Sequence, residues 1–243
     1  METDNQVRVE QFWMKGLALP PESFADLPPI TCTVQQRYSG VQLLKRADRL
    51  IVGAPPHKAE FIKKATAGCS PDDVFSVDWL QHVFADAAGL ILGPALVNYA
   101  DRSSFQSRAD LNAREISVND ADEYRDLVTA LDSTELHASG LSADVFPAFG
   151  VFHDGKLCAV ANYSVWDECI AHIVVATHPA WRRRGFAKAV VHALATHAFD
   201  RGLILQWRAL HSNPNSLNLA SQLGFRYYCS TIYVRLRTVH QSR

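Results

Sequence analysis

The stretch THPAWRRRGFAKAVV, residues Thr177–Val191, places three arginines and a glycine between an apolar run and a segment typical of a helix. A helix N-terminus has backbone N–H groups without intrahelical partners and a partial positive charge, so it can bind a phosphate group. Gly185 lacks a Cβ and allows a close approach to the backbone, and the small Ala187 keeps the first turn open. The side chains of Arg182–Arg184 can neutralise phosphates from the flanks. We therefore expect a seat for a pyrophosphate group.

Two other interpretations of the arginines remain open, a solvated turn and a contact with nucleic acid. The 24 Lys and Arg residues are balanced by 25 Asp and Glu residues, and the net charge of −1 gives no general attraction to a polyanion. No flanking basic face or stacking platform accompanies the triplet. We expect a small-molecule partner and no nucleic acid.

The elements around the stretch predict a mixed sheet with helices on its faces, an α/β (α+β) fold. Asp154 and Gly155 stand between alternating apolar runs, which is a strong hairpin signal. The next apolar run ends at Pro179, and the helix after the arginines ends at Gly202. A strand, a short helix ending at Gly224 and a final strand follow. The binding crevice should lie where a parallel strand ends and its helix begins.

The chain changes character near residue 110. We expect residues 1–110 to form an N-terminal α/β subdomain and residues 111–243 to form the phosphate-binding domain. In the first part, TCTVQQRYSGVQLLKR predicts a hairpin that turns at Ser39-Gly40, and helices are expected near His57–Ala67 and Val77–Phe84. No motif in this part carries chemistry, so it is either a degenerate partner half or a substrate-side unit.

Two blocks of the second part resemble the GNAT superfamily of N-acetyltransferases. The superfamily carries R/Q-x-x-G-x-G/A after its fourth strand, which is matched by Arg182, Gly185 and Ala187. The later block NPNSLNLASQLGF is similar to its signature N-x-x-S-x-x-x-x-x-x-L-G-F, through Asn213, Ser216, Leu223, Gly224 and Phe225. The resemblance covers Arg114–Leu236 and implies the GNAT acyl-CoA N-acyltransferase fold.

The resemblance also implies a co-substrate, acetyl-CoA. Its pyrophosphate would rest on the amides and arginines of the first block, its pantetheine amides would pair with the preceding strand, and the second block would touch the pantetheine arm. The residues so implied are Val175, Ala176, Thr177, Arg182, Arg183, Arg184, Gly185, Phe186, Ala187, Lys188, Asn213 and Ser216. The implied activity is direct transfer of the acetyl group to the amine of a small molecule, amino-acid-like or an antibiotic.

Transfer to an amine calls for a proton acceptor close to the strand that precedes the arginines. Glu168 and His172 are the candidates, with Asp167 behind them. Counting along the strand leaves the choice open, because a β-bulge would reverse the face that each residue occupies. Many relatives place the base at the position of Ala171.

The proton donor for the departing thiolate is equally open. Many relatives have a tyrosine four residues before the L-G-F glycine, where this chain has Ala220. Tyr227, Tyr228 or Tyr233 could replace it, or the thiolate could leave without a dedicated acid. The departures at Ala171 and Ala220 support an alternative function, a non-catalytic CoA-binding sensor or pseudoenzyme of the same fold.

The remaining composition predicts a cytosolic protein. The five cysteines are odd in number, scattered and without a C-x-x-C spacing, so we expect neither a disulfide framework nor a metal site. No apolar run reaches the roughly 18 residues of a membrane span, and we expect no membrane partner. The oligomeric state is open and includes a homodimer.

Overall fold

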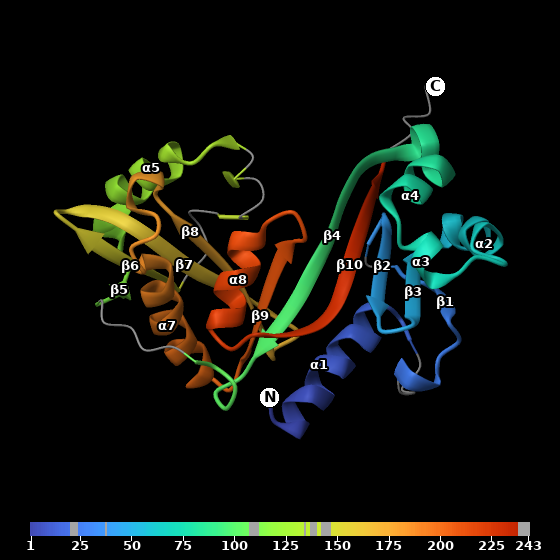
Figure 1. The fold of residues 1–243 in the computed structure, drawn as a ribbon, viewed down its shortest axis with the longest axis horizontal. Coiled ribbons are helices and arrows are strands. Elements are labelled where there is room, and N and C mark those ends of the chain that lie inside the picture. The colour runs from blue at the N-terminus through green and yellow to red at the C-terminus, as the bar shows by residue number, and fades with distance from the viewer. Residues whose placement is uncertain are drawn as a thin grey trace. The chain divides into compact units, whose positions relative to one another are not determined.

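The chain divides into two compact units of mixed α/β structure (Figure 1). The computed structural model describes residues 1–19, 24–36, 38–106, 112–133, 135–136, 140–141 and 147–237. The C-terminal unit comprises residues 1–5, 98–208 and 218–226, and the N-terminal unit comprises residues 6–97, 209–217 and those from Tyr227 onward. The boundary expected at residue 110 lies outside the described residues. The long first stretch of the N-terminal unit ends at Val97, and the chain also changes unit after Asn5, Arg208, Leu217 and Arg226.

The C-terminal unit contains a sheet with the strand order β9-β8-β7-β6-β5. Its strands are β5 (Arg114–Glu115), β6 (Ala148–His153), β7 (Lys156–Trp166), β8 (Ile170–Thr177) and most of β9 (Ile204–Leu210). Its helical elements are η3 (Val118–Asp120), α5 (Ala121–Ala130), η4 (Pro179–Trp181), α7 (Phe186–Phe199) and most of α8 (Pro214–Gln222). Neighbouring strands from β5 to β8 are antiparallel, and β8 and β9 are parallel. The mixed α/β class predicted from the sequence is confirmed.

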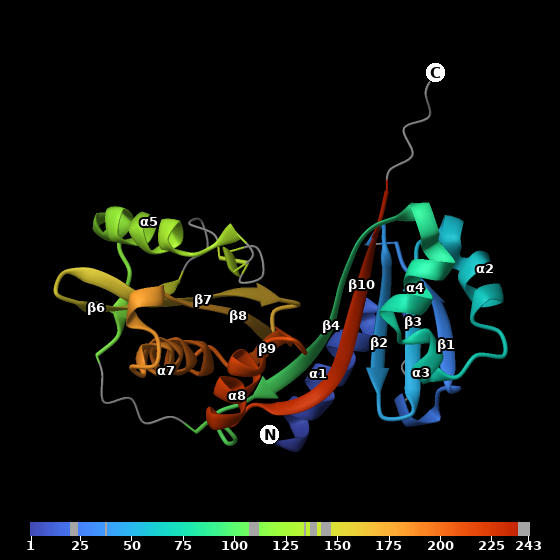
Figure 2. The same ribbon diagram turned by 45° about the horizontal axis from the view of Figure 1, so that its top comes forward.

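The predicted hairpin at Asp154 and Gly155 joins β6 to β7. Both residues have positive φ angles, +50° and +72°, as a two-residue turn between twisted strands requires. The strands carry an apolar core on the face covered by α5, where Leu127 packs with Val160 and Ala176. Figure 2 shows α5 on this side of β6–β8 and α7 on the other. The sheet is therefore covered on both faces.

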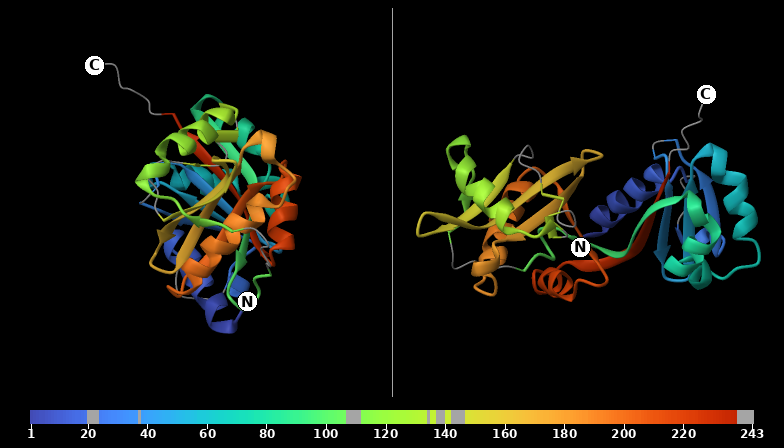
Figure 3. Two further views of the ribbon diagram at one scale, coloured as in Figure 1. Left: turned by 90° about the vertical axis from the view of Figure 1, so that its left-hand side faces the viewer. Right: turned by 90° about the horizontal axis from the view of Figure 1, so that it is seen from above.

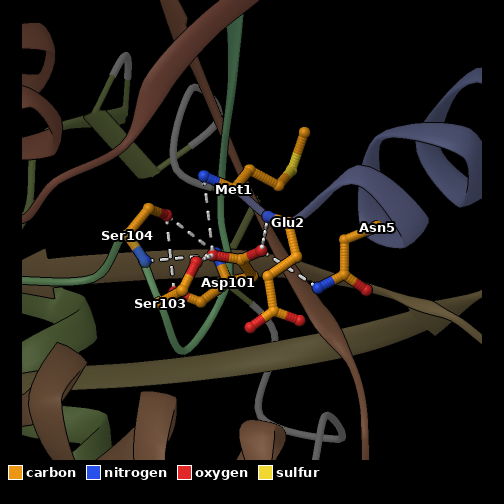
Figure 4. Close-up of polar contacts among 6 residues, drawn as sticks. All are labelled: Met1, Glu2, Asn5, Asp101, Ser103 and Ser104. Atoms are coloured by element: carbon orange, nitrogen blue, oxygen red, sulfur yellow. Dashed lines mark hydrogen bonds and ion pairs between the residues drawn. The ribbon is translucent and has the colours of Figure 1, made fainter.

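Asp101, directly after β4 (Ala88–Ala100), ties the first residues of the chain to the C-terminal unit (Figure 4). Its Oδ2 accepts hydrogen bonds from the Glu2 N–H at 2.7 Å and from Asn5 Nδ2 at 3.0 Å. Its Oδ1 accepts from the Ser103 hydroxyl at 2.8 Å and the Ser104 N–H at 3.0 Å. Burial opposes ionisation of this carboxyl, but the four donors outweigh it and hold the pKa of Asp101 well below its usual range. A buried carboxylate thus fixes the turn after β4.

The N-terminal unit contains a sheet with the strand order β1-β3-β2-β10-β4. Its strands are β1 (Ile30–Val34), β2 (Val41–Arg46), β3 (Arg49–Ala54), most of β4 and β10 (Arg226–Leu236). Its helical elements are most of α1 (Thr3–Gly16), then η1 (Phe24–Asp26), α2 (Pro56–Ala65), α3 (Pro71–Val74), α4 (Val77–Phe84) and η2 (Ala85–Ala87). Both predicted helices are confirmed, as α2 and α4. Figure 3 gives two further views, in which α2 lies beside β1 and β3.

The hairpin predicted at Ser39-Gly40 is wrong. The strands β1 and β2 both pair with β3, which lies between them, β1 in parallel and β2 antiparallel. The hairpin turn is instead at Ala47-Asp48, between β2 and β3, and Ala47 has a φ of +50°. Gly40 has a different reason to be glycine, because a Cβ there would overlap the carbonyl oxygen of Val234 on β10. The glycine at position 40 is therefore explained by close packing against β10 and not by a turn between β1 and β2.

Candidate functional site

The strands β8 and β9 are paired only at their beginnings. Their parallel register joins Ile170 to Ile204 and ends at the pair His172–Gln206, whereas β8 stays paired with β7 up to Thr177. Beyond His172 no pair joins these two described strands. The outer edge of β8 from Ile173 to Thr177 therefore has backbone groups that an extended ligand could meet, as an added strand would.

The three strand residues predicted to bind the cofactor lie on this open part of β8. The side chain of Ala176 is buried in the core under α5, so Ala176 can offer only its backbone. Val175 and Thr177 are partly exposed. A role for the backbone of these three residues in cofactor binding stays a prediction.

The chain passes from β8 into α7 through a loop with two left-handed residues. Arg183 has a φ of +66°, and Gly185 has φ +84° and ψ −4° at the N-cap of α7. The carbonyl of Gly185 accepts from the N–H groups of Lys188 and Ala189, at 3.0 and 3.3 Å. The N–H groups of Phe186 and Ala187, the first two helical residues, have no preceding turn to bond to, and they point out of the helix end. This is the arrangement expected of an anion seat.

The arginines before α7 have different surroundings, although all are exposed. Arg182 binds Glu135 through its Nη2 at 2.8 Å and the Thr177 carbonyl through its Nε at 3.4 Å. The Arg184 guanidinium lies over the ring of Trp181, 4.8 Å from its centroid. Arg182 thus ties the loop to the segment after α5, a contact that the sequence analysis missed because Glu135 is 47 residues away.

The first helical residues contribute mainly backbone. The Phe186 side chain is buried and contacts Trp181 edge to face, with ring centroids 6.1 Å apart. Ala187 and Lys188 are partly exposed. A phosphate at this helix end would therefore meet amides, with Lys188 and the arginines as the nearby cations in sequence.

The second block forms the start of α8, and its first residues fall in the N-terminal unit. The Oδ1 of Asn213 accepts from the Ser216 N–H at 3.1 Å, so Asn213 caps the helix. Gly224, which ends the block, has a φ of +83°, and a Cβ there would overlap the carbonyl oxygen of Ser104. Helix capping therefore accounts for Asn213, and the close approach of Ser104 accounts for Gly224.

The two candidate bases lie in unlike places. Glu168 is exposed in the turn between β7 and β8, with a φ of +61°. His172 lies on β8 where the pairing with β9 ends, and its ring stacks on Trp166 with centroids 4.0 Å apart and an interplanar angle of 14°. Only His172 lies beside the open edge of β8.

The imidazole of His172 belongs to a chain of polar contacts. Its Nδ1 lies 2.9 Å from Oε1 of Gln206, and Nε2 of Gln206 donates to the Tyr99 hydroxyl at 2.5 Å. Burial, followed by the charge of Arg208, lowers the pKa of His172 to about 4, and the hydrogen bond with Gln206 opposes this shift. The ring is neutral at pH 7.

Sequence reasoning missed both Gln206 and Tyr99. Both are almost fully buried. The available signal was a lone amide inside the apolar strand LILQWRAL, because a buried amide needs hydrogen-bonding partners.

The tyrosines that could have replaced the missing acid are engaged inside the N-terminal unit. Tyr227 bonds to the Ser230 hydroxyl at 3.0 Å, and Tyr233 accepts from Gln42 Nε2 at 2.9 Å. Burial raises the pKa of Tyr228 far above its usual value, against the nearby charge of Arg46. We therefore assign the role of proton donor to the departing thiolate to none of these three tyrosines.

A comparison with known protein families matches part of the chain that contains this fold and helix end. Residues 146–233 match the family model for GNAT acetyltransferase. The match covers less than half of the chain and confirms, over this segment, the resemblance found in the sequence. No curated protein matches the chain.

Two solved structures with TM-scores above 0.5 agree with the fold. A GCN5-related N-acetyltransferase from Kribbella flavida has 14% identity and a TM-score of 0.53, with 97% of this chain and 96% of that chain covered. A conserved protein of unknown function from Staphylococcus epidermidis has 11% identity and a TM-score of 0.52, with coverages of 88% and 96%. A GCN5-related N-acetyltransferase-like protein from Streptococcus suis has 18% identity, a TM-score of 0.48 and coverages of 84% and 87%. Across the described residues, none of the helices has the length and apolar character that crossing a membrane requires.

Proposed function

We propose that this protein transfers an acetyl group from acetyl-CoA to the amine of a small molecule. The observation that carries the proposal is the left-handed Gly185 at the start of α7, directly after a β8 edge that has lost its partner strand. The family match over residues 146–233 supports the reaction class. An amino-acid-like compound or an antibiotic is the proposed acceptor, and the cytosol is the proposed location.

The residues around this helix end fit a CoA molecule. The amides around Arg183–Lys188 would hold the pyrophosphate, where a helix N-terminus favours negative charge. Those of Phe186 and Ala187 would contribute first, because the Lys188 N–H already donates to the Gly185 carbonyl. The backbone of Val175–Thr177 would pair with the pantetheine amides. Asn213 and Ser216 are proposed as further pantetheine contacts on the family resemblance alone. Acetyl-CoA would supply the thioester carbonyl that the amine attacks.

His172 is the proposed proton acceptor. An alkyl amine with a pKa of about 10.4 is almost entirely protonated at pH 7, and it must lose protons on the way to the amide. A neutral imidazole beside the open β8 edge can accept one. Glu168 is the weaker candidate, because the exposed turn offers nothing to orient its carboxylate against the edge of β8.

A non-catalytic CoA-binding sensor is the second candidate. Ala220 is buried, and it stands where many relatives have a tyrosine. A pKa of about 4 also makes His172 a weaker base than an ordinary histidine. Both observations are compatible with a protein that binds CoA but transfers no acetyl group.

Thiol release from acetyl-CoA, measured with a panel of small amines, distinguishes the two functions. The proposal expects thiol release that depends on the amine and yields the acetylated amine by mass spectrometry. Calorimetric binding of CoA with no thiol release across amino acids, polyamines and aminoglycosides would favour the sensor. No binding of CoA would contradict both.

A further inference from the structure

We propose that Gln206 and Tyr99 are positioning residues that hold His172 as the Nδ1–H tautomer and leave Nε2 as the proton-accepting atom. The tautomer matters for catalysis only if the proposed function is right, so this part of the inference rests on the proposed function. Its structural basis is the unbroken contact chain from His172 through Gln206 to Tyr99, all within the C-terminal unit.

The donors and acceptors of this chain determine the tautomer. The Gln206 amide nitrogen can only donate, so the 2.5 Å contact requires the Tyr99 oxygen to accept. The other end of the amide, Oε1, can only accept, and it faces Nδ1 of His172 at 2.9 Å. With the amide in this orientation, Nδ1 carries the proton. In a neutral imidazole the second nitrogen, Nε2, then has a free lone pair.

The packing holds these three side chains in place. Gln206 and Tyr99 are each about 1% exposed, so the surrounding core restricts the movement of both side chains. His172 and Gln206 are register partners, which brings their side chains to the same face of the sheet. The indole of Trp166 stacks on the imidazole at 4.0 Å and restricts its ring plane. Together they restrict both the proton position and the ring orientation.

The chain offers a matched control in a second tyrosine–histidine pair. The Tyr163 hydroxyl lies 2.9 Å from Nδ1 of His197. Tyr163 and His197 are on β7 and α7, and His197 contacts Phe149 on the same side of the sheet. Tyr163→Phe removes the same hydroxyl group as Tyr99→Phe without touching the His172 chain.

The direct test is the nitrogen-15 NMR spectrum of the His172 ring in the ligand-free protein at pH 7. We expect the protonated signal at Nδ1 in the parent protein and in Tyr163→Phe. Tyr99→Phe releases one end of the amide, so a mixture of tautomers should appear. A proton on Nε2 in the parent protein, or identical spectra for the two tyrosine variants, would overturn the inference.

Steady-state kinetics test whether the Nδ1–H tautomer of His172 contributes to acetyl transfer. Tyr99→Phe should lower kcat about threefold to tenfold, the effect of one neutral hydrogen bond, with KM for acetyl-CoA unchanged. Gln206→Leu should lower kcat by about 100-fold or more, because the tautomer is lost. Gln206→Glu should restore most of the activity, because a carboxylate facing Nδ1 again requires the proton there. Equal losses for Leu and Glu at this position would contradict the positioning role.

The two proposals fail separately. The tautomer is measured without acetyl-CoA, so a protein with Nδ1–H that transfers no acetyl group would overturn the proposed function, and the catalytic role of the tautomer with it. Acetyl transfer by a protein with the proton on Nε2 would overturn this inference alone.

Discussion

Nδ1 of His172 lies 2.9 Å from Oε1 of Gln206, and these two residues form the last pair that joins β8 to β9. The contact stands at the point where the two parallel strands part. A neutral, oriented imidazole is thus held beside the strand edge that leads, through the arginine loop, to the start of α7. This relationship links the proposed anion seat to the proposed proton acceptor.

Replacing His172 should abolish most of the acetyl transfer while leaving CoA binding intact. His172→Asn keeps a polar group of similar size but removes the proton acceptor, and general-base contributions are typically about 10²–10⁴-fold in rate. We expect a loss of kcat in this range by thiol release, with CoA affinity by calorimetry within about twofold. Glu168→Gln serves as the control and should change kcat by less than about twofold. Equal losses in the two variants would contradict the assignment.

The titration of His172 should be displaced toward acid. Burial, then Arg208, lowers its pKa to about 4, so an NMR titration should place the midpoint there. Arg208→Gln removes the nearby positive charge and should raise this midpoint. For the same reason, the acidic limb of the pH profile of kcat should move to higher pH in Arg208→Gln. An unchanged midpoint in Arg208→Gln would show that the arginine does not act on this ring.

The same shift fixes the sign of one stability effect. The folded pKa of about 4 lies below the ordinary value of 6.5, so the unfolded chain binds the proton first as the pH falls. His172 therefore lowers the free energy of unfolding progressively from about pH 6.5 to pH 4 and has no such effect above pH 6.5. Urea unfolding of His172→Asn should show a weaker decline over that window than the parent protein.

Asp101→Asn should destabilise the C-terminal unit. The carboxylate accepts four hydrogen bonds, and an amide nitrogen would face donors in place of one oxygen. We expect a loss of about 2–4 kcal/mol in the free energy of unfolding, measured in urea at pH 7. Because the folded pKa is depressed, the stabilisation is present above the ordinary value of 3.8 and is lost as the pH falls below it.

A matched exposed variant, Asp126→Asn, should leave the free energy of unfolding within about 0.5 kcal/mol of the parent value. An Asp101→Asn protein as stable as this control would contradict the anchoring role.

Gly224→Ala should be more destabilising than Gly202→Ala. Both glycines have positive φ angles, +83° and +70°, so both variants carry backbone strain of about 1–2 kcal/mol. Only at Gly224 would the new methyl group overlap a neighbour, the Ser104 carbonyl oxygen, which adds about 1–3 kcal/mol. At Gly202 nothing lies within 4 Å. Equal midpoints of thermal unfolding would show that Ser104 can move aside.

Local signals in the sequence were sufficient for the elements that carry the anion seat. The hairpin at Asp154 and Gly155 and the start of α7 at Gly185 depend on backbone angles that particular residues favour, so they could be read directly. The helix α4 (Val77–Phe84) likewise follows from its apolar spacing.

Contacts between distant segments could not be read in this way. The strand β3 between β1 and β2 depends on pairing energies that the local pattern of Ser39-Gly40 does not contain. The His172–Gln206–Tyr99 chain joins three strands, and Tyr99 and Gln206 are 107 residues apart. The sequence suggested His172, and the lone amide in LILQWRAL indicated a buried hydrogen bond. Only the strand order shows that this amide meets the His172 ring.

Calorimetry with coenzyme A tests the central claim, that the amides at the start of α7 hold its diphosphate. Gly185→Glu places a carboxylate and a strained residue at this helix end, and Gly202→Glu makes the same change at a left-handed glycine after the other end of α7. We predict that the parent protein and Gly202→Glu bind coenzyme A alike and that Gly185→Glu binds it at least about tenfold more weakly. Equal affinity in all three proteins, or no heat of binding in the parent, would contradict the account.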